Sequence, residues 1–439
     1  MTLPRALMGL LALVLVSAAA FVGYSVASRV IPEDVRARPA TLGDIMLPMK
    51  TNVVSPEDAD VRFRDSRPRW GGLQEIGWDE PGAFTYSLGP HANGTYREGR
   101  GGGPSDDTFP AAEFYLNNAV AKNADVTFTV KGRQFAIHYV TFGHSDAMVW
   151  IDGQRASVEP FTARDRKKKG ADSWIEITLP EVRSVTIRFA GPFLFSGVAH
   201  PRDEQIAVKA TPPRFTLGVV SDSFYEQNRE RGSQSSSAAL VLSTLTGFRT
   251  WNMAQGGTGY LNGGDADTPG FRVSELAGTS AYGSDERLDA VANAPIDALL
   301  VNGSINDYSL FSPAEYRLAV DRYLSMIEMR RPTLPIVLVG IEPLSRRGLP
   351  DEPVNEFVTM TNTLKDMATE HRNVVGFIDP YTPNWLTGTG STAKPRGDGN
   401  QDQYIGEDGW HPNGAGQVFY QTQIVSELRK LPLRRNDPR

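Results

Sequence analysis

Four side chains in two short stretches of the sequence have the types that acyl transfer requires. Ser221 and Ser223 flank one aspartate in "VVSDSFY" (219–225), and His411 follows Asp408 by three residues in "DGWH". Acyl transfer needs a nucleophile, a base that takes its proton, and hydrogen-bond donors for the oxyanion that forms. A carboxylate beside an imidazole can fix its tautomer and stabilise the imidazolium. These residues therefore predict a serine nucleophile with a histidine base, and they leave open which serine attacks.

The elements that would position these side chains lie after residue 214. Short apolar runs alternate there with segments of helical length, and this alternation predicts an α/β fold with a parallel, doubly wound sheet. The predicted strands are "FTLGVV" (215–220), "FRTWNMA" (248–254), "PIDALLVNGS" (295–304), "PIVLVGIEP" (335–343) and "VVGFIDP" (374–380). The predicted helices are "SQSSSAALVLSTLTG" (233–247), "SPAEYRLAVDRYLSMIEMRRP" (312–332), "VNEFVTMTNTLKDMATEHRN" (354–373) and one beginning near "NGAGQVFYQTQIVSELRKL" (413–431).

Four polar loops follow from this order of elements. They are "SDSFYEQ" after the first strand, "QGGTGYLNGG" after the second, "NGSINDYS" after the third and "EDGWHPNGAG" before the last helix. Sites in an open α/β sheet gather at the carboxyl ends of the strands, so we expect these loops to meet at one edge. Of the six histidines, only His411 lies in one of the four loops. It is therefore the candidate base, with Asp408 beside it.

The four loops resemble a known family. "SDS", "GGTG", "IND" and "DGWHP" occur in the order of the four blocks of the SGNH (GDSL) hydrolase superfamily, in which the blocks carry Ser, Gly, Asn and His. Order, spacing and strand context agree over roughly 215–430. The resemblance implies a flavodoxin-like three-layer α/β sandwich, with the hydrolase domain at 214–432.

The resemblance also implies a role for each loop. Ser223 would be the nucleophile, and His411 would be the general base and then the acid for the leaving alcohol. Asp408 would orient the imidazole. The oxyanion hole would combine the backbone N–H groups of Ser223 and Gly257 with the side-chain amide of Asn306. Glycine at 257 suits this role because it lets the main chain approach the substrate closely.

The sequence departs from the family pattern at two positions and leaves one choice open. Ser221 stands where the first block usually has glycine, and Ser304 stands two places before the block-three asparagine, where glycine is also usual. Both substitutions add a small side chain near the site, and neither removes a catalytic group. Gly256 is the alternative to Gly257 in the oxyanion hole, although counting from Asn252 favours Gly257.

Several aromatic residues lie in or near the loops. Tyr225, Tyr260, Tyr308 and Trp410 are candidates for stacking on a sugar ring, and Trp385 is a further aromatic residue nearby. Packing in the core or at the rim of the site is an equally good interpretation of each.

The part of the chain before the α/β region is rich in β patterns. Five runs between 111 and 210 show alternation or β-branched and aromatic enrichment, which predicts a β-sandwich of jelly-roll type. They are "DVTFTVKG", "QFAIHYVTFG", "AMVWIDGQR", "SWIEITLP" and "SVTIRFAG". The Asp-Gly of "IDGQ" (151–154) predicts a type I′ hairpin turn. Residues 30–110 are predicted as an irregular linker and the start of this domain. The domain boundary is expected near Pro212 and Pro213.

This β-rich region gives the chain a second resemblance. A β domain with "FLFSGVAHP" (193–201) before the boundary is similar to the jelly-roll partner of two-domain esterases of the carbohydrate esterase family 2 type.

Composition excludes several function classes. The 439 residues carry a net charge of −6 and include no cysteine, which excludes disulfides, thiolate catalysis and cysteine-ligated zinc. The basic run "RDRKKKG" (164–170) is typical of a solvated loop, and no region is strongly basic, so nucleic acid is not expected as a partner. The aspartates of "GGDADTPG" (263–270) are interpreted as a polar loop. We therefore expect no metal site, and the mechanism needs no cofactor.

The N-terminus predicts a targeting segment at 1–29. Residues 6–28 carry no charge, and the run is long enough to span a bilayer as a helix. Small residues at Ala18, Ala20 and Ala27 could serve a signal peptidase, so cleavage and retention as a membrane anchor both stay open. A buried helix of a soluble protein is a third interpretation. Either targeting interpretation places the remaining chain outside the cytoplasm, secreted or anchored to the membrane.

Together these features predict an extracytoplasmic serine esterase. The expected substrate is a small acyl ester, with an O-acetyl group on a carbohydrate as the expected case, and the carbohydrate follows from the resemblance. An O-acyltransferase that uses the same acyl-enzyme is one alternative. A carbohydrate-binding or envelope protein whose hydrolase fold is inactive is another.

Overall fold

The computed structural model describes most of the chain after residue 40. The described ranges are 41–87, 91–95, 108–113, 120–121, 124–141, 146–162, 171–191, 193–226, 237–264, 281–344 and 355–433. The predicted targeting segment at 1–29 lies outside them, and so do the basic run 164–170 and most of 263–270. Residues 40–439 form one compact unit. No helix within the described ranges has the length and hydrophobicity that a membrane crossing requires.

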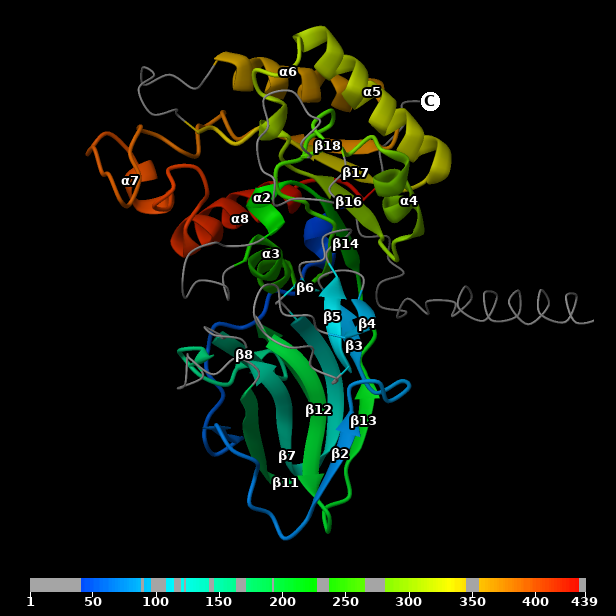
Figure 1. The fold of residues 1–439 in the computed structure, drawn as a ribbon, viewed down its shortest axis with the longest axis vertical. Coiled ribbons are helices and arrows are strands. Elements are labelled where there is room, and N and C mark those ends of the chain that lie inside the picture. The colour runs from blue at the N-terminus through cyan, green and yellow to red at the C-terminus, as the bar shows by residue number, and fades with distance from the viewer. Residues whose placement is uncertain are drawn as a thin grey trace, which may run out of the picture. The chain divides into compact units, whose positions relative to one another are not determined.

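A five-stranded parallel sheet forms the centre of the α/β region (Figure 1). Its order is β15-β14-β16-β17-β18, the order typical of flavodoxin-like folds. The strands are β14 (Thr216–Val220), β15 (Arg249–Asn252), β16 (Ala298–Val301), β17 (Ile336–Val339) and β18 (Val374–Ile378). All five predicted strands are therefore present, and the prediction of a parallel, doubly wound sheet is confirmed. Every residue of β14, β16 and β17 is buried, as expected for strands covered on both faces.

Helices cover this sheet in two groups. α3 packs against α8, and α5 packs against both α4 and α6 (Figure 1). The longer helices are α3 (Ala238–Thr246), α4 (Asp285–Asn293), α5 (Pro313–Arg330), α6 (Asn355–Glu370) and α8 (Gly414–Leu428). The short helical turns are η2 (Leu42–Ile45), α2 (Ser223–Glu226), η4 (Ile305–Asp307) and α7 (Gln401–Tyr404). α5 begins where its sequence predicts, because Ser312 and Glu315 form a capping box and Pro313 takes the first helical position.

The sequence patterns did not predict α4. Its buried positions are Arg287, Leu288, Ala290 and Val291, so a charged residue occupies the face that contacts the core. A helix with arginine in its buried stripe lacks the apolar periodicity on which such a prediction depends.

The β-rich region forms a large antiparallel sheet with two very long strands. β7 (Ala124–Thr141) and β11 (Ala171–Gly191) pair along most of their length (Figure 1). Each spans two of the predicted strands, and the register of their pairing shifts between Thr178 and Arg183, where the sequence had indicated a break in β11. The expected I′ turn is confirmed: Asp152 and Gly153 have φ angles of 50° and 79° between β8 (Asp146–Ile151) and β9 (Gln154–Arg155).

Shorter strands complete the antiparallel pairing. In the ten-stranded sheet they are β1 (Asp60–Arg64), β2 (Leu73–Gly77), β3 (Thr85–Ser87), β10 (Phe161–Thr162), β12 (Phe193–Pro201) and β13 (Ala207–Ala210). A separate three-stranded sheet contains β4 (His91–Thr95), β5 (Thr108–Glu113) and β6 (Val120–Ala121). The segment predicted as mainly irregular at 30–110 thus contributes several strands. The jelly-roll topology and the domain bounds stay predictions.

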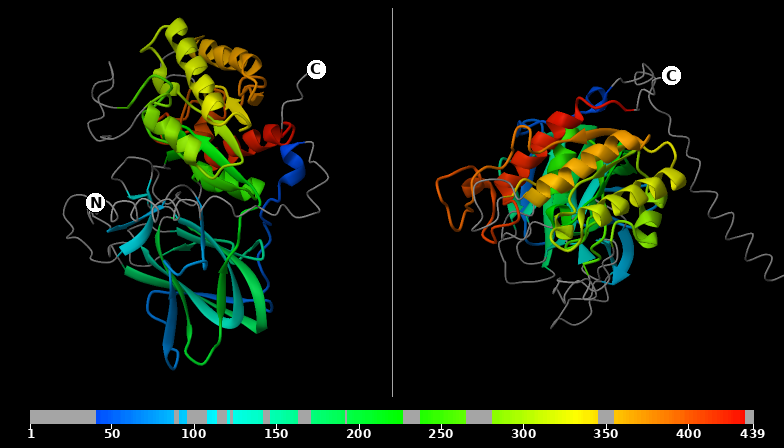
Figure 2. Two further views of the ribbon diagram at one scale, coloured as in Figure 1. Left: turned by 90° about the vertical axis from the view of Figure 1, so that its right-hand side faces the viewer. Right: turned by 90° about the horizontal axis from the view of Figure 1, so that it is seen from above.

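Residues 41–54 run from the α/β region to the antiparallel sheet. The N–H of Leu42 donates to the carbonyl of Leu431, the N–H of Leu47 to that of Thr246, and the N–H of Val54 to that of Arg155. Figure 2 shows η2, at the start of this segment, near the C-terminal end of α8. The first described residues therefore pack on the last ones, before the chain enters its β-rich part.

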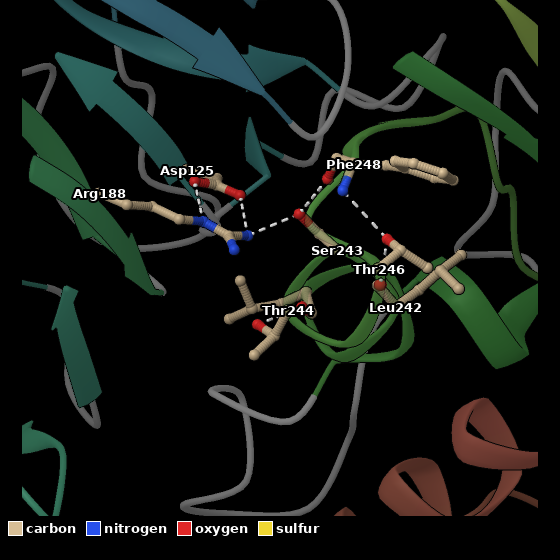
Figure 3. A network of polar contacts seen from close by, with 8 residues as sticks. Asp125, Arg188, Leu242, Ser243, Thr244, Thr246 and Phe248 are labelled. Carbon is tan, nitrogen blue, oxygen red and sulfur yellow. Dashed lines mark hydrogen bonds and ion pairs between the residues drawn. The ribbon is translucent and has the colours of Figure 1, made fainter. Parts of the chain in front are cut away.

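A buried ion pair also joins the antiparallel sheet to α3 (Figure 3). Nη2 of Arg188 on β11 lies 2.5 Å from Oδ2 of Asp125 on β7 and donates to Oγ of Ser243 at 2.7 Å. Ser243 in turn donates to the carbonyl of Phe248 at 2.6 Å. The arginine therefore links two strands of one sheet to the helix that follows the nucleophile loop.

Candidate active site

Ser223 lies at the turn between β14 and α2. The strand ends at Val220, two residues form the turn, and Ser223 is the first residue of the helix. Oδ1 of Asp222 accepts a hydrogen bond from the N–H of Phe224 at 3.1 Å, which closes the turn. On the far side of α2, Nε2 of Gln417 on α8 donates to the carbonyl of Phe224 at 3.0 Å. The nucleophile is therefore held from its own strand and from the last helix.

Ser223, His411 and Asp408 form a continuous hydrogen-bonded chain. Nε2 of His411 lies 2.8 Å from Oγ of Ser223, and Nδ1 of His411 lies 2.6 Å from Oδ2 of Asp408. An ionised carboxylate can only accept, so the imidazole proton lies on Nδ1 and Nε2 is left to accept from the serine hydroxyl. The structure thus brings Ser223 next to a histidine that lies 188 positions later in the sequence.

Asp408 is ionised in this arrangement. Partial burial opposes the charge, but the hydrogen bonds from the side chain and backbone of His411 and from the backbone of Trp410 hold the pKa of Asp408 well below its ordinary value. Its other oxygen, Oδ1, accepts from the backbone N–H groups of Trp410 at 2.9 Å and His411 at 3.0 Å. One carboxylate therefore shapes the turn and orients the ring.

The predicted oxyanion donors come from three loops of the same edge. Gly257 is buried and has a φ of 78°, a conformation that side chains disfavour. Nδ2 of Asn306 donates to the carbonyl of Thr258 at 3.0 Å, which sets the amide against the loop that carries Gly257. Within the described ranges, the backbone N–H groups of Ser223 and Gly257 make no hydrogen bond. These two N–H groups can therefore donate to a ligand.

Two buried carboxyls tie these loops to one another. Asp222 of the nucleophile turn accepts from the N–H of Ser304 at 3.0 Å, and Asp307 accepts from the N–H groups of Tyr260 at 2.7 Å and Asn262 at 2.8 Å. Burial raises the pKa of Asp222 to about 6 and that of Asp307 to about 7, although the backbone donors oppose this rise. These contacts give both aspartates a structural role at this edge of the sheet.

A buried arginine that the sequence reasoning missed lies behind the predicted oxyanion loop. The guanidinium of Arg287 donates to the carbonyl of Met253 at 2.8 Å, to Oγ1 of Thr258 at 3.0 Å and to Oε1 of Gln255 at 3.2 Å. It also reaches the carbonyl of Ser221 at 3.4 Å. These contacts span both sides of the glycine turn and the end of β14. The only feature of the sequence that could have indicated this role was the position of Arg287 on an otherwise apolar face of α4.

The two serines at family glycine positions lie away from the surface. Ser221 and Ser304 are both fully buried. Oγ of Ser304 lies 2.8 Å from the hydroxyl of Tyr316, and the residue adopts a φ of 79°. Oγ of Ser221 has no hydrogen-bond partner among the described residues. Neither hydroxyl adds an exposed group to the site.

The four aromatic candidates differ in how deeply the structure buries them. Tyr225 and Tyr260 are buried at 1% and 3% exposure, which favours core packing over contact with a substrate. The hydroxyl of Tyr225 donates to Oε1 of Gln421 at 2.7 Å, and Tyr260 packs edge-on against three other tyrosines. Tyr308 is half-buried against Phe357. These rings fill the core because their loops fold inward at the sheet edge.

Trp410 differs from these rings. It is 39% exposed and is adjacent in sequence to His411. Its role as a substrate-binding residue stays a prediction. Trp385 is 5% exposed and packs edge-on against Tyr420, so it belongs to the core.

Metal ligands do not cluster in the described part of the chain: no three His, Asp or Glu side chains there are arranged to hold an ion. The arrangement instead supplies a hydroxyl, an imidazole that can take its proton, and unpaired N–H donors at the same edge. This chemistry suits attack on a carbonyl carbon and stabilisation of the resulting oxyanion.

Comparisons with known proteins identify relatives of the fold. No family model and no curated protein matches the sequence. A salicylyl-acyltransferase, SsfX3, from a tetracycline biosynthetic pathway is similar in structure with a TM-score of 0.57 and 12% identity, over 84% of this chain and 100% of that chain. A family two carbohydrate esterase from Clostridium thermocellum is similar with a TM-score of 0.48 and 14% identity, over 79% of this chain and 98% of that chain.

A third similar structure is an acetyl xylan esterase from the rumen bacterium Butyrivibrio proteoclasticus. It gives a TM-score of 0.46 and 13% identity, over 82% of this chain and 98% of that chain. At these identities the likeness concerns the fold. The likeness to the acyltransferase, which extends over most of both chains, shows that this chain shares its fold.

Proposed function

We propose that this protein is a serine ester hydrolase of the SGNH type that works through an acyl-enzyme on Ser223. The observation that carries the proposal is the unbroken chain from Oγ of Ser223 to Nε2 of His411 at 2.8 Å and from Nδ1 to Asp408 at 2.6 Å. A hydroxyl, a base and an orienting carboxylate at these separations form the arrangement that activates a serine.

In the first half-reaction, Oγ of Ser223 attacks the carbonyl carbon of the ester while its proton moves to Nε2 of His411. The tetrahedral oxyanion accepts hydrogen bonds from the N–H groups of Ser223 and Gly257 and from the amide of Asn306. The intermediate collapses when the bond to the alcohol oxygen breaks, and His411 returns the proton to that oxygen. The products of this half-reaction are the free alcohol and the acyl-enzyme.

In the second half-reaction, water replaces the alcohol. Nε2 of His411 takes a proton from the water as its oxygen attacks the acyl carbon. The new intermediate collapses to the free acid, and Oγ of Ser223 regains its proton from His411. Asp408 keeps its charge throughout and stabilises the imidazolium in both halves.

Hydrolysis of p-nitrophenyl acetate by the purified full-length protein tests this proposal. We expect Ser223→Ala to lower kcat to the background rate, because the nucleophile is lost. Ser221→Ala is the matched control two residues away, and it should keep most of the activity because its hydroxyl is buried without a partner among the described residues. Equal activity of Ser223→Ala and the wild type would refute the assignment of the nucleophile, and a wild type that hydrolyses no ester would favour an inactive carbohydrate-binding or envelope protein.

We propose that the substrate is a small acyl group, namely acetyl, on a carbohydrate. The exposed Trp410 beside His411 supports a sugar, because an aromatic face can stack on a sugar ring while its edge stays in water. Release of acetate from acetylated polysaccharides, compared between wild type and Trp410→Ala, tests this proposal. We expect Trp410→Ala to have a higher KM for the glycan than the wild type and an unchanged KM for p-nitrophenyl acetate.

Transfer of the acyl group to a hydroxyl is a second candidate function. It is favoured by the shared fold with a salicylyl-acyltransferase, at a TM-score of 0.57. The same acyl-enzyme would serve, with an acceptor alcohol in place of water. Adding an alcohol or sugar acceptor and measuring acylated product by mass spectrometry distinguishes the two. Free acid as the only product supports hydrolysis.

We also propose an extracytoplasmic location, with the N-terminal segment cleaved or retained as a membrane anchor. The uncharged run at 6–28 supports this proposal. N-terminal sequencing of the protein from fractionated cells tests it. A mature chain beginning after residue 20 indicates cleavage, an intact chain in the membrane fraction indicates an anchor, and an intact chain in the cytosol refutes the proposal.

A further inference from the structure

One buried carboxyl at the edge of the parallel sheet takes no part in the proposed mechanism. Glu342 follows β17, and its side chain is 0% exposed. Its Oε1 accepts a hydrogen bond from Nδ2 of Asn302 at 2.7 Å. In the part of the chain that the structure describes, Oε2 has no hydrogen-bond partner. A buried charge without compensation is costly, so this geometry favours the protonated, neutral form of the side chain.

The hydrogen bond sets Glu342 against the turn that precedes the predicted oxyanion amide. Asn302 is the first residue after β16, and Ser304, at the end of the same turn, donates its N–H to Asp222. Gly303 and Ser304 have φ angles of 114° and 79°. A positive φ is unfavourable for a residue with a side chain, such as Ser304. This backbone conformation persists only when the surrounding structure holds it in place. Two buried carboxyls from different strands therefore hold the turn from both ends.

The ionisable groups that interact with Glu342 in the described part of the chain come from five segments. They are the carboxyl of Asp222 in the nucleophile turn and the phenols of Tyr225 on α2, Tyr316 on α5, Tyr381 after β18 and Tyr420 on α8. Burial raises the pKa of each phenol above its ordinary value, so all four stay neutral near pH 7. The charge that acts on Glu342 is that of Asp222. Burial, and then this charge, raises the pKa of Glu342 to about 8.

We propose that Glu342 is a positioning residue whose neutral carboxyl holds the Asn302–Ser304 turn and thereby keeps the amide of Asn306 at the oxyanion site. This inference rests on the proposed esterase function. Ionisation of Glu342 places a second negative charge beside Asp222 in the low-dielectric region under the nucleophile turn. Such a charge disfavours the oxyanion of the transition state, so activity falls as the residue loses its proton.

The pH dependence of kcat tests the proposal in the full-length protein. Wild type, Glu342→Gln and Glu342→Leu are compared from about pH 6 to about pH 9.5 with p-nitrophenyl acetate. Glutamine keeps an oxygen acceptor for Asn302 but cannot ionise, whereas leucine removes the acceptor. Glu427→Gln, on the exposed end of α8, is the matched control for a glutamate-to-glutamine change.

Wild type and Glu427→Gln should lose on the order of tenfold in kcat between pH 7.5 and 9.5. Glu342→Gln should stay within a few-fold of wild type at pH 7 and lose this alkaline decline. Glu342→Leu should lower kcat on the order of tenfold or more at every pH, with little change in KM. A wild type without the decline, or a decline that persists in Glu342→Gln, would overturn the proposal.

Thermal unfolding gives a readout that does not depend on activity. A carboxyl whose pKa is higher in the folded state than in the unfolded state contributes stability at acidic pH, and this contribution is lost as the pH rises through about 8. The Tm of wild type minus the Tm of Glu342→Gln should therefore fall between about pH 5 and about pH 8. A constant difference would contradict a buried neutral Glu342. If the wild type hydrolyses no ester but this difference falls, the proposed function fails while the assignment of Glu342 as a neutral buried acid stands.

Discussion

Asp408 performs two tasks within one turn of the chain. Its Oδ1 accepts from two backbone N–H groups, which shapes the turn, and its Oδ2 accepts from Nδ1 of His411. The side chain is 43% exposed, so water has partial access to it. Orientation of the imidazole by a residue so close in sequence explains why a short motif was enough to indicate the base.

Replacement of Asp408 by asparagine should lower kcat while KM changes little. Asparagine can donate to Nδ1, which favours the tautomer that leaves no acceptor on Nε2 for the hydroxyl of Ser223. We expect a loss on the order of 10²–10⁴-fold. Steady-state kinetics with p-nitrophenyl acetate measures it. Glu407→Gln, an exposed neighbouring carboxylate, should retain wild-type kinetics, and a similar loss there would point to a general charge effect.

At the scale of elements, the ends of strands and helices decide how the loops meet. α3 ends at Gly247, which has a φ of 72° and donates its N–H to the carbonyl of Ser243. A Cβ at this glycine would lie 1.9 Å from the carbonyl oxygen of Leu47 in the segment that crosses the α/β region. The position therefore has two independent reasons to be glycine, one of backbone conformation and one of space.

Gly247→Ala should lower the free energy of unfolding by about 2–5 kcal/mol, the sum of the left-handed backbone cost and the steric clash. Gly82→Ala is the matched control, because Gly82 has a similar φ of 76° with no atom within 4 Å of an added Cβ. It should cost about 1–2 kcal/mol. Urea unfolding of both variants measures the difference, and equal costs would show that the segment at Leu47 moves away freely.

At the scale of the whole molecule, the antiparallel sheet and the α/β region share buried polar contacts. Arg188 pairs with Asp125 and donates to Ser243 on α3 (Figure 3). Its guanidinium also lies over the ring of Trp150, 5.0 Å from the ring centroid. The pair is almost fully buried, with side-chain exposures of 5% and 2%. We therefore expect the two regions to unfold together, because loss of α3 would expose the ion pair between Arg188 and Asp125.

Arg188→Met should destabilise the protein by about 3–5 kcal/mol, because it leaves the carboxylate of Asp125 buried without its cation. The double variant Arg188→Met/Asp125→Leu should recover most of this loss, since both charges are then gone. Urea unfolding followed by fluorescence measures both. A double variant as unstable as Arg188→Met would show that packing around the arginine, and not the charge pair, supplies the stability.

Apart from the choice of Ser223 over Ser221, which rests on the family resemblance, the amino-acid sequence by itself determined the sheet, the order of its loops, the candidate base and its orienting carboxylate. These follow from local signals. Alternation of strands and helices leads to a parallel sheet, and a parallel sheet collects the loops at one edge. The short motif around His411 needed no distant contact to be recognised.

Only the tertiary structure decided which side chains at that edge are buried. Tyr225 and Tyr260 pack into the core, while Trp410 stays exposed beside His411. Arg287 and Glu342 lie behind the candidate site because helices and strands far apart in the sequence converge there. Burial depends on these long-range contacts, and a polar residue surrounded by them carries no local pattern that marks it.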